Sequence, residues 1–200
     1  IDAGGTYTDV VLYDRDRNVV LAKSKAPTTK WDFTIGIGHA LDGVDAALLG
    51  RVELVAVSTT LATNAIVEGY GQRVGLLVMP PYGLFNDADI PHEPKAVVKG
   101  SLDITGVELE PLDAAQVVQS ALDLVRRNGA ESFAVSGFAS TVNQAHEIEV
   151  KRLVREATGK SVTCGHELSD LLDFRTRAVT AVLNARIIPR LERFLRDATR

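Results

Sequence analysis

Short runs of strand character alternate with stretches of helical periodicity, and this alternation most limits how the chain can fold. The strand-like runs are Ile1-Asp2, Asp9 to Tyr13, Val19 to Ala22, Glu53 to Val57, Arg73 to Met79, Phe133 to Val135 and Val162 to Cys164. The second and third runs flank a polar turn and predict an antiparallel hairpin, whereas the later runs are separated by helices, as in β-α-β units. We expect the runs at 53–57 and 73–79 to be buried. The order predicts an α/β protein with a mixed sheet.

Four stretches carry apolar residues at helical spacing. They cover residues 32–49, 113–128, 143–157 and the chain from about Ser169 onward. Asp32 is expected to cap the first of these helices. The third starts either at Asn143 or at a capping box formed by Thr141 and Gln144. The last is long, and we expect Pro189 to interrupt it because proline has no backbone N–H.

Composition excludes several classes of protein. The chain has 200 residues, with 22 basic and 26 acidic side chains, for a net charge of −4. This balance argues against a nucleic-acid or anionic-membrane surface, which requires a basic stripe. No apolar run reaches the ~18 residues of a membrane span. The single cysteine, Cys164, excludes an internal disulfide framework and suggests a reducing, cytoplasmic setting. Because the chain opens on Ile1 at a strand end, we expect a piece of a longer protein.

The opening segment, Ile1-Asp2-Ala3-Gly4-Gly5-Thr6-Tyr7-Thr8-Asp9, carries the strongest chemical signal. Two glycines allow a tight turn that approaches a ligand closely, and successive N–H groups in such a turn bind anions. Thr6 and Thr8 add hydroxyl donors. Asp2 and Asp9 could hold a hydrated Mg²⁺ against phosphate oxygens. The alternative is a plain hairpin turn whose Thr and Asp side chains satisfy their own backbone.

A second cluster of polar residues follows the run at 53–57. Ser58-Thr59-Thr60-Leu61-Ala62-Thr63-Asn64 places four hydroxyls and an amide within seven residues. A helix N-terminus needs only one or two such groups. The surplus favours contact with substrate or phosphate, and helix capping is the alternative.

The remaining candidates are more weakly marked. Asp87, Asp89, His92 and Glu93 lie in a long loop at 80–94 and form either a metal site or a solvated turn. That loop is itself a candidate domain boundary or functional flap. Arg177 could contact a phosphate, pair with Asp173, or form an ordinary surface ion pair. Cys164 has no Cys or His partner at catalytic spacing, so we expect a buried thiol.

The motifs resemble a known family. Asp2-Ala3-Gly4-Gly5-Thr6-x-Thr8-Asp9 is similar to the first phosphate loop of the ATPase superfamily that includes actin, hexokinase and heat-shock chaperones. Thr59-Thr60-Leu61-Ala62-Thr63-Asn64-Ala65, the pair His146-Glu147, and Arg177-x-x-Thr180-Ala181-Val182-Leu183-Asn184-Ala185 resemble motifs of the hydantoinase A/5-oxoprolinase family. Three positions depart from the family pattern: Tyr7 for Phe, Val57-Ser58 for His-Gly, and Thr176 for an acid.

The resemblance implies a ribonuclease H-like mixed sheet in the order β-β-β-α-β-α-β, a small α/β subdomain and a long C-terminal helix. It implies an ATPase-type lobe at 1–94, the subdomain at 95–168, and a helix at 169–200 leading into a C-terminal ATPase core. It also implies an ATP-dependent enzyme that phosphorylates a substrate oxygen to open a cyclic amide. The alternatives are a subunit of an ATP-dependent ketone carboxylase and an actin-like or chaperone-like reactivating factor.

Site residues carry over by position. The resemblance implies ATP and Mg²⁺ as cofactors and a second, B-type subunit as partner. Asp2 and Asp9 would act catalytically by holding Mg²⁺ indirectly. The expected phosphate-binding residues are Gly4, Gly5, Thr6, Tyr7 and Thr8. The expected substrate-binding residues are Thr59, Thr60, Asn64 and Arg177.

Overall fold

The chain folds into two compact units, one formed by Ile1–Tyr70 with Pro189–Arg200 and the other by Gly71–Ile188. This computed structural model describes residues 1–29, 31–60, 62–63, 69 and 71–198. The division differs from the expected boundary near residue 94. The strand at 74–79 pairs with strands of the second unit, so the 80–94 loop lies inside that unit.

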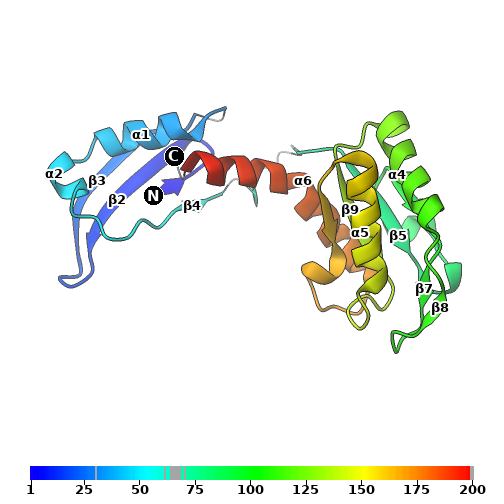
Figure 1. The fold of residues 1–200 in the computed structure, drawn as a ribbon. Helices are drawn as coiled ribbons and strands as arrows, with labels where there is room; N and C mark the ends of the chain where they lie inside the picture. The colour runs from blue at the N-terminus through cyan, green and yellow to red at the C-terminus, as the bar shows by residue number, and fades with distance from the viewer. Residues whose placement is uncertain (30, 61, 64–68, 70, 199–200) are drawn as a thin grey trace. The chain divides into compact units, whose positions relative to one another are not determined.

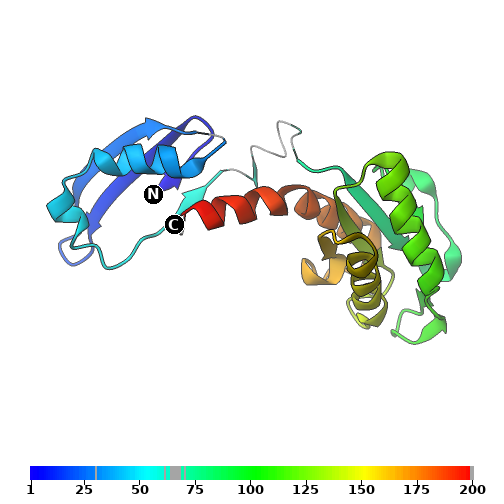
Figure 2. The same ribbon diagram turned by 45° about the horizontal axis from the view of Figure 1, so that its top comes forward.

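The first unit contains a four-stranded mixed sheet in the order β3-β2-β1-β4 (Figure 1). The strands are β1 (Asp2–Ala3), β2 (Tyr7–Asp14), β3 (Val19–Pro27) and β4 (Ser58–Thr59). The predicted hairpin is confirmed as β2 and β3, and β4 runs parallel to β1. Helix α1 (Phe33–Asp42) lies across one face of the hairpin (Figure 2). Two clusters of buried side chains, from the sheet, from α1 and the residues after it, and from the C-terminal helix, form the core of this unit: Ala3, Val10, Ala26, Phe33, Ile37, Ala40, Val44 and Phe194.

Two expectations for this unit are corrected. The helix expected over 32–49 starts at the Asp32 cap but divides into α1 and α2 (Ala46–Leu49). Gly43 caps the end of α1, where its N–H donates to the Leu41 carbonyl, and a Cβ at this position would lie 2.1 Å from the Ser24 hydroxyl. The buried strand expected at 53–57 is irregular and exposed, with Leu54 73% exposed. Strand pairing with β1 begins just after this run: Asp2 pairs with Ser58, and Ala3 pairs with Thr59.

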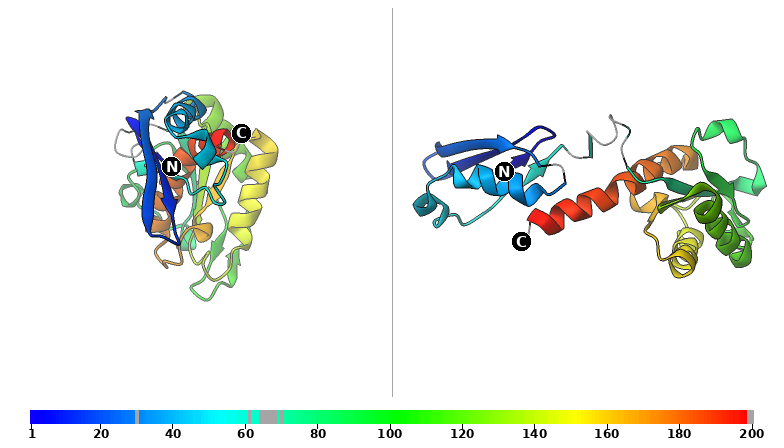
Figure 3. Two further views of the ribbon diagram at one scale, coloured as in Figure 1. Left: turned by 90° about the vertical axis from the view of Figure 1, so that its left-hand side faces the viewer. Right: turned by 90° about the horizontal axis from the view of Figure 1, so that it is seen from above.

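The second unit is built on a four-stranded parallel sheet in the order β10-β9-β5-β6. Alternate side chains of β5 point to opposite faces: Leu77 and Met79 join one core cluster, and Leu76 and Val78 join the other. Helices α4 and α5 cover the first face, and the start of α6 covers the second (Figure 3). The elements of the second unit, with α6 continuing into the residues of the first, are β5 (Val74–Met79), β6 (Lys95–Val97), β7 (Ser101–Leu102), β8 (Glu108–Glu110), α4 (Ala114–Asn128), β9 (Ser132–Gly137), α5 (Ala145–Thr158), β10 (Val162–Cys164) and α6 (Phe174–Ala198). Short 3₁₀ turns lie at Pro81–Gly83, Asp87–Asp89 and Gly165–Glu167.

Helix α6 continues through Pro189, so the expected interruption is wrong. Proline removes the N–H that would bond the carbonyl four residues earlier. That carbonyl, on Ala185, accepts the Ser132 hydroxyl at 3.2 Å instead. The next carbonyl, on Arg186, accepts the Gln72 N–H at 3.1 Å. These contacts with residues distant in sequence satisfy the helix at the proline.

The open question about the start of α5 is answered by the structure. The Asn143 side chain accepts the N–H of Ala145 at 3.1 Å, whereas Gln144 makes no side-chain capping bond. None of the described helices is both long and apolar enough to cross a membrane.

Helix α4 offers a test of how much one cap contributes. The Asp113 carboxylate accepts the N–H of Gln116 at 2.9 Å. Asp113→Ala should lower the free energy of unfolding by about 1 kcal/mol in urea denaturation, because it leaves an N-terminal N–H without its partner. The control is Asp123→Ala on the same helix, where Asp123 forms a loose 3.8 Å ion pair with Arg127. This change should lower the free energy of unfolding by only a few tenths of a kcal/mol. Equal losses would contradict the assignment of the cap.

Candidate functional site

The glycine turn between β1 and β2 closes as a tight hairpin. The Gly4 N–H donates to the Tyr7 carbonyl at 3.0 Å, and the Thr28 N–H donates to the Thr6 carbonyl at 2.9 Å. A Cβ on Gly4 would lie 2.9 Å from the Tyr7 oxygen, so this close approach requires glycine. The Gly4 N–H is therefore used within the turn. Thr6 and Tyr7 are exposed beside it.

One row of paired positions crosses the sheet beside this turn. Ser58 pairs with Asp2, Asp2 with Asp9, and Asp9 with Lys25. Directly paired residues share a face of the sheet. The row lies on the face opposite α1, and the two carboxylates predicted for Mg²⁺ are immediate neighbours on it. The Ser58 hydroxyl donates to Asp2 at 2.9 Å, and the Lys25 ammonium lies 3.2 Å from Asp9.

The next row of pairs faces α1 instead. Thr8 is 1% exposed, and its hydroxyl lies 2.9 Å from the Thr28 hydroxyl. The expectation that the Thr8 hydroxyl contacts phosphate is therefore corrected, because the strand alternation turns it into the core. The Thr59 hydroxyl donates to the Ala3 carbonyl at 2.9 Å. Thr60 is exposed, and Asn64 lies outside the described residues.

Arg177 is not at a surface. Its side chain is fully buried, and its guanidinium donates to the carbonyls of Leu171 and Gly137. Burial lowers the pKa of Arg177, with opposing contributions from Glu147 and Asp173. Neither the phosphate contact nor the surface ion pair expected for this residue fits its position. It holds the end of β9 to the first turns of α6.

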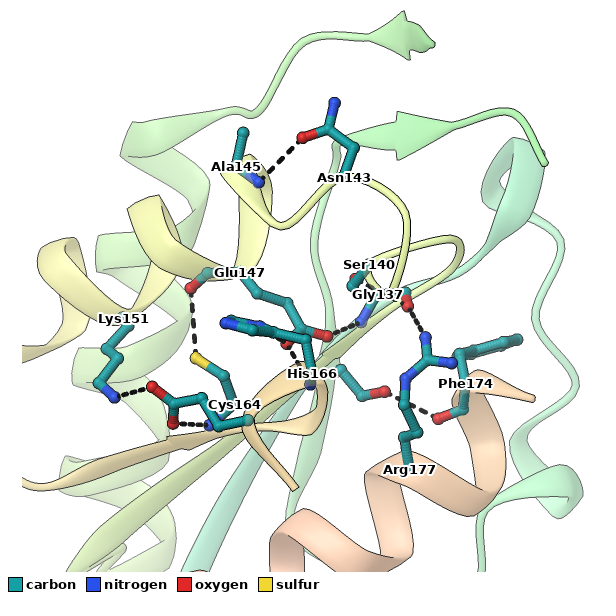
Figure 4. A network of polar contacts seen from close by, with 12 residues as sticks. Gly137, Ser140, Asn143, Ala145, Glu147, Lys151, Cys164, His166, Phe174 and Arg177 are labelled. Carbon is teal, nitrogen blue, oxygen red and sulfur yellow. Dashed lines mark hydrogen bonds and ion pairs between the residues drawn. The ribbon is translucent and has the colours of Figure 1, made fainter. Parts of the chain in front are cut away.

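Around Arg177 lies a buried polar network that no sequence motif predicted (Figure 4). The fully buried Glu147 carboxylate accepts the N–H groups of Gly137 and His166 at 2.8 and 3.0 Å, and it lies 2.6 Å from His166 Nδ1. The peptide groups of Gly137 thus bond Glu147 through the N–H and Arg177 through the carbonyl. The pairs His146-Glu147 and His166-Glu167 were the available signal, although polar pairs in a sequence do not reveal burial.

Cys164 adjoins this network as a buried thiol, as expected. Burial, together with the charges of Glu147 and Glu167, raises its pKa well above the usual range. Its sulfur donates to the Glu147 carbonyl at 3.5 Å. Metal-ligating atoms of Cys164, Glu147 and His166 lie within 4.8 Å of one another. Because each already bonds within the protein, we interpret the trio as a structural cluster.

The acidic loop at 80–94 does not gather into a metal site. Asp87 and Glu93 each lie 3.0 Å from the buried ammonium of Lys95. These two carboxylates raise the pKa of Lys95 despite the opposing effect of burial. His92 lies 2.9 Å from the Val74 carbonyl, and Asp89 pairs with Arg175. The acids in this loop therefore hold it in place through lysine and arginine.

Comparison with known proteins assigns the family. The sequence profile of the hydantoinase/oxoprolinase N-terminal region matches residues 1–158. The chain belongs to the hydantoinase/oxoprolinase family. Its fold is the α/β, ATPase-like fold of this family, as expected from the motifs.

Individual relatives agree with this assignment. The alpha subunit of caprolactamase from Pseudomonas jessenii is 31% identical over 98% of this chain and 32% of its own length. The crystal structure of that ATP-dependent caprolactamase matches all of this chain and 33% of its own, with a TM-score of 0.73 and 29% identity. The gamma subunit of acetophenone carboxylase from Aromatoleum aromaticum is 28% identical over 92% of this chain and 30% of its own.

A more distant structure shares the fold. Nucleotide-free acetone carboxylase matches 94% of this chain and 31% of its own, with a TM-score of 0.74 and 22% identity. The chain thus spans about a third of the length of the relatives it matches. Most of each of these relatives has no counterpart here.

The buried network can be tested by a single near-isosteric change. Glu147→Gln replaces one acceptor oxygen with a donor amide that faces other donors, and it removes the charge that balances Arg177. The free energy of unfolding should fall by about 3 kcal/mol in urea denaturation. Glu149→Gln is the matched control on the same helix. It breaks an exposed pair with Arg152 and should cost less than about 1 kcal/mol.

Proposed function

We propose that this chain is the N-terminal part of an ATP-dependent enzyme that phosphorylates a substrate oxygen and thereby opens a cyclic amide. The observation that carries the proposal is the pairing of Asp2 with Asp9 on an exposed sheet face beside the Gly4–Thr6 turn, in a member of the hydantoinase/oxoprolinase family. Two relatives are described as ATP-dependent, which supports ATP as the cofactor.

The chemistry of the donors fits Mg²⁺. Asp2 and Asp9 offer hard carboxylate oxygens, which Mg²⁺ binds directly or through its water shell. Two carboxylates at directly paired strand positions repel each other, so a cation beside them relieves a cost that the sheet otherwise bears. When bound, Mg²⁺ neutralises charge on the phosphates. The chain's own contribution is to hold the two carboxylates in fixed register and to offer Gly5, Thr6 and Tyr7 to the phosphate at the turn.

The substrate end is assigned to the segment that follows β4. Thr60 is exposed beside the paired strands, and Asn64 belongs to the same motif. A hydroxyl placed there can donate to the oxygen that is phosphorylated or to the amide that is opened. Arg177 is no longer part of this proposal, because its guanidinium is used inside the second unit.

A ketone carboxylase subunit is the second candidate, favoured by the likeness to the acetophenone carboxylase gamma subunit. ATP turnover by the full-length protein separates the two. Stimulation by hydantoin, 5-oxoproline or caprolactam supports the amide-opening enzyme, whereas stimulation by acetophenone with bicarbonate supports the carboxylase. A reactivating factor would ignore all of these compounds.

Because two relatives are named as subunits, we also propose a second subunit as partner. The proposal places the protein in the reducing cytoplasm, because its 200 residues contain one cysteine.

Asp2→Asn in the full-length protein tests the metal role. The amide oxygen can still accept the Ser58 hydroxyl, so the melting temperature should change little. Removing one negative charge from the Mg²⁺ site should lower ATP turnover by about 10-fold or more, since charge-assisted contacts are worth about 1.5–3 kcal/mol. Asp16→Asn, at an exposed position in the β2–β3 turn, is the control and should leave turnover unchanged. Normal turnover in Asp2→Asn would make Asp2 a strand-end residue only.

Thr60→Val and Thr59→Val form a matched pair. Thr60→Val should reduce turnover by about 10²–10³-fold if its hydroxyl stabilises the transition state. Thr59→Val should instead lower the free energy of unfolding by about 1 kcal/mol, because its hydroxyl bonds the Ala3 carbonyl. A destabilised but fully active Thr60→Val protein would return Thr60 to a structural role.

A further inference from the structure

Lys25 stands at the end of the row that carries the two carboxylates. It pairs with Asp9 across β2 and β3, and its ammonium lies 3.2 and 3.3 Å from the two Asp9 carboxylate oxygens. The same ammonium lies 4.8 Å from the centre of the Tyr7 ring. Tyr7 is two residues closer to the glycine turn than Asp9 and shares its face. The ammonium is therefore held beside both Asp9 and the turn-side aromatic ring.

The charges of the row are unbalanced. Asp2 and Asp9 contribute two negative charges, and Lys25 contributes one positive charge. Ser58 adds only a neutral hydroxyl. A divalent cation would reverse the sign of the row and make it complementary to a polyphosphate. A cation that binds Asp9 must also compete with the ammonium that already occupies both of its oxygens.

We infer that Lys25 is a phosphate-binding residue that exchanges partners. In the free protein it neutralises Asp9. When Mg²⁺ and nucleotide bind, the cation takes over the charge of Asp9, and the Lys25 ammonium moves to a phosphate oxygen beside the turn. The long, flexible lysine stem allows this movement, and ammonium binds phosphate as a compact point charge. During the exchange, the face of the Tyr7 ring attracts the Lys25 ammonium through a cation–π interaction. This inference rests on the proposed function of the turn.

Lys23 is a matched control in the same strand. It lies on the same face but pairs with Val11 instead of a carboxylate. Both lysines are exposed, and the Lys25–Asp9 pair is half-exposed, so removing either charge should leave the fold intact. Lys25→Met and Lys23→Met remove the ammonium and keep an apolar stem. Melting temperatures check that all variants remain folded.

The experiment is calorimetric titration of the full-length protein with Mg·ATP, and with Mg²⁺ alone. For Lys25→Met, Mg·ATP should bind about 10–100-fold more weakly, the size expected for one charge-assisted contact. Mg²⁺ alone should bind as tightly as in the unchanged protein or more tightly, since its competitor is gone. Lys25→Arg should recover part of the Mg·ATP affinity. For Lys23→Met, the Mg·ATP affinity should stay within about 2-fold.

The outcomes separate the two proposals. Suppose that the unchanged protein binds Mg·ATP, that Asp2→Asn lowers this affinity, and that Lys25→Met and Lys23→Met bind Mg·ATP equally well. The inference about Lys25 is then overturned, and the proposed function stands. If Lys25→Met weakens the binding of Mg²⁺ alone as much as the binding of Mg·ATP, the inferred exchange of partners is wrong and Lys25 only positions Asp9. If the unchanged protein binds no Mg·ATP, both proposals fall.

Discussion

The register of the β1–β2 pair determines which side chains of the first unit face outward, and the proposed chemistry depends on it. Asp2 opposes Asp9 and Ala3 opposes Thr8. Side chains alternate along a strand, so a slip of β1 by one residue would bury the Asp2 carboxylate against α1 and expose Ala3. The tight turn at Gly4 and the buried core under Ala3 both oppose such a slip. The turn and the core thus place two like charges side by side, an arrangement that folding alone would not favour.

The second unit uses its polar groups differently. Glu147 and Arg177 are fully buried, and they bond the two sides of the peptide chain at Gly137. Buried charges are tolerated when they are paired and hydrogen-bonded. Here both charged side chains, Glu147 from α5 and Arg177 from α6, form hydrogen bonds with the backbone of Gly137 at the end of β9. The network therefore holds these two helices at the C-terminal end of β9, an inner strand of the sheet.

Local signals in the sequence identified most elements, because hairpin turns, helix caps and apolar periodicity act over a few residues. The failures depend on contacts distant in sequence. The run at 53–57 has strand composition, but it is irregular and exposed, and β1 pairs instead with Ser58 and Thr59. Pro189 is accommodated because Ser132 and Gln72 bond the carbonyls near it. Arg177 carries the charge of a surface residue, and its burial follows only from the backbone carbonyls that surround it. The sequence likewise predicts that Asp2 and Asp9 hold Mg²⁺, but it does not reveal the buried orientation of Thr8.

Partner satisfaction is a useful criterion for separating functional from structural polar groups in this chain. The Thr8 hydroxyl shares a bond with Thr28, and the Thr59 hydroxyl bonds the Ala3 carbonyl. Two nitrogens of the Arg177 guanidinium bond carbonyls, while its buried Nε has no hydrogen-bond partner among the described residues. A ligand would have to displace each of these bonds within or beside a packed core, at the cost of leaving a buried group unpaired. Asp2 and Asp9 differ because their partners, Ser58 and Lys25, lie on the solvent side and can move without disturbing the core. We therefore propose the chemistry for that exposed row, where partners can exchange without disturbing the core, and not for the buried network.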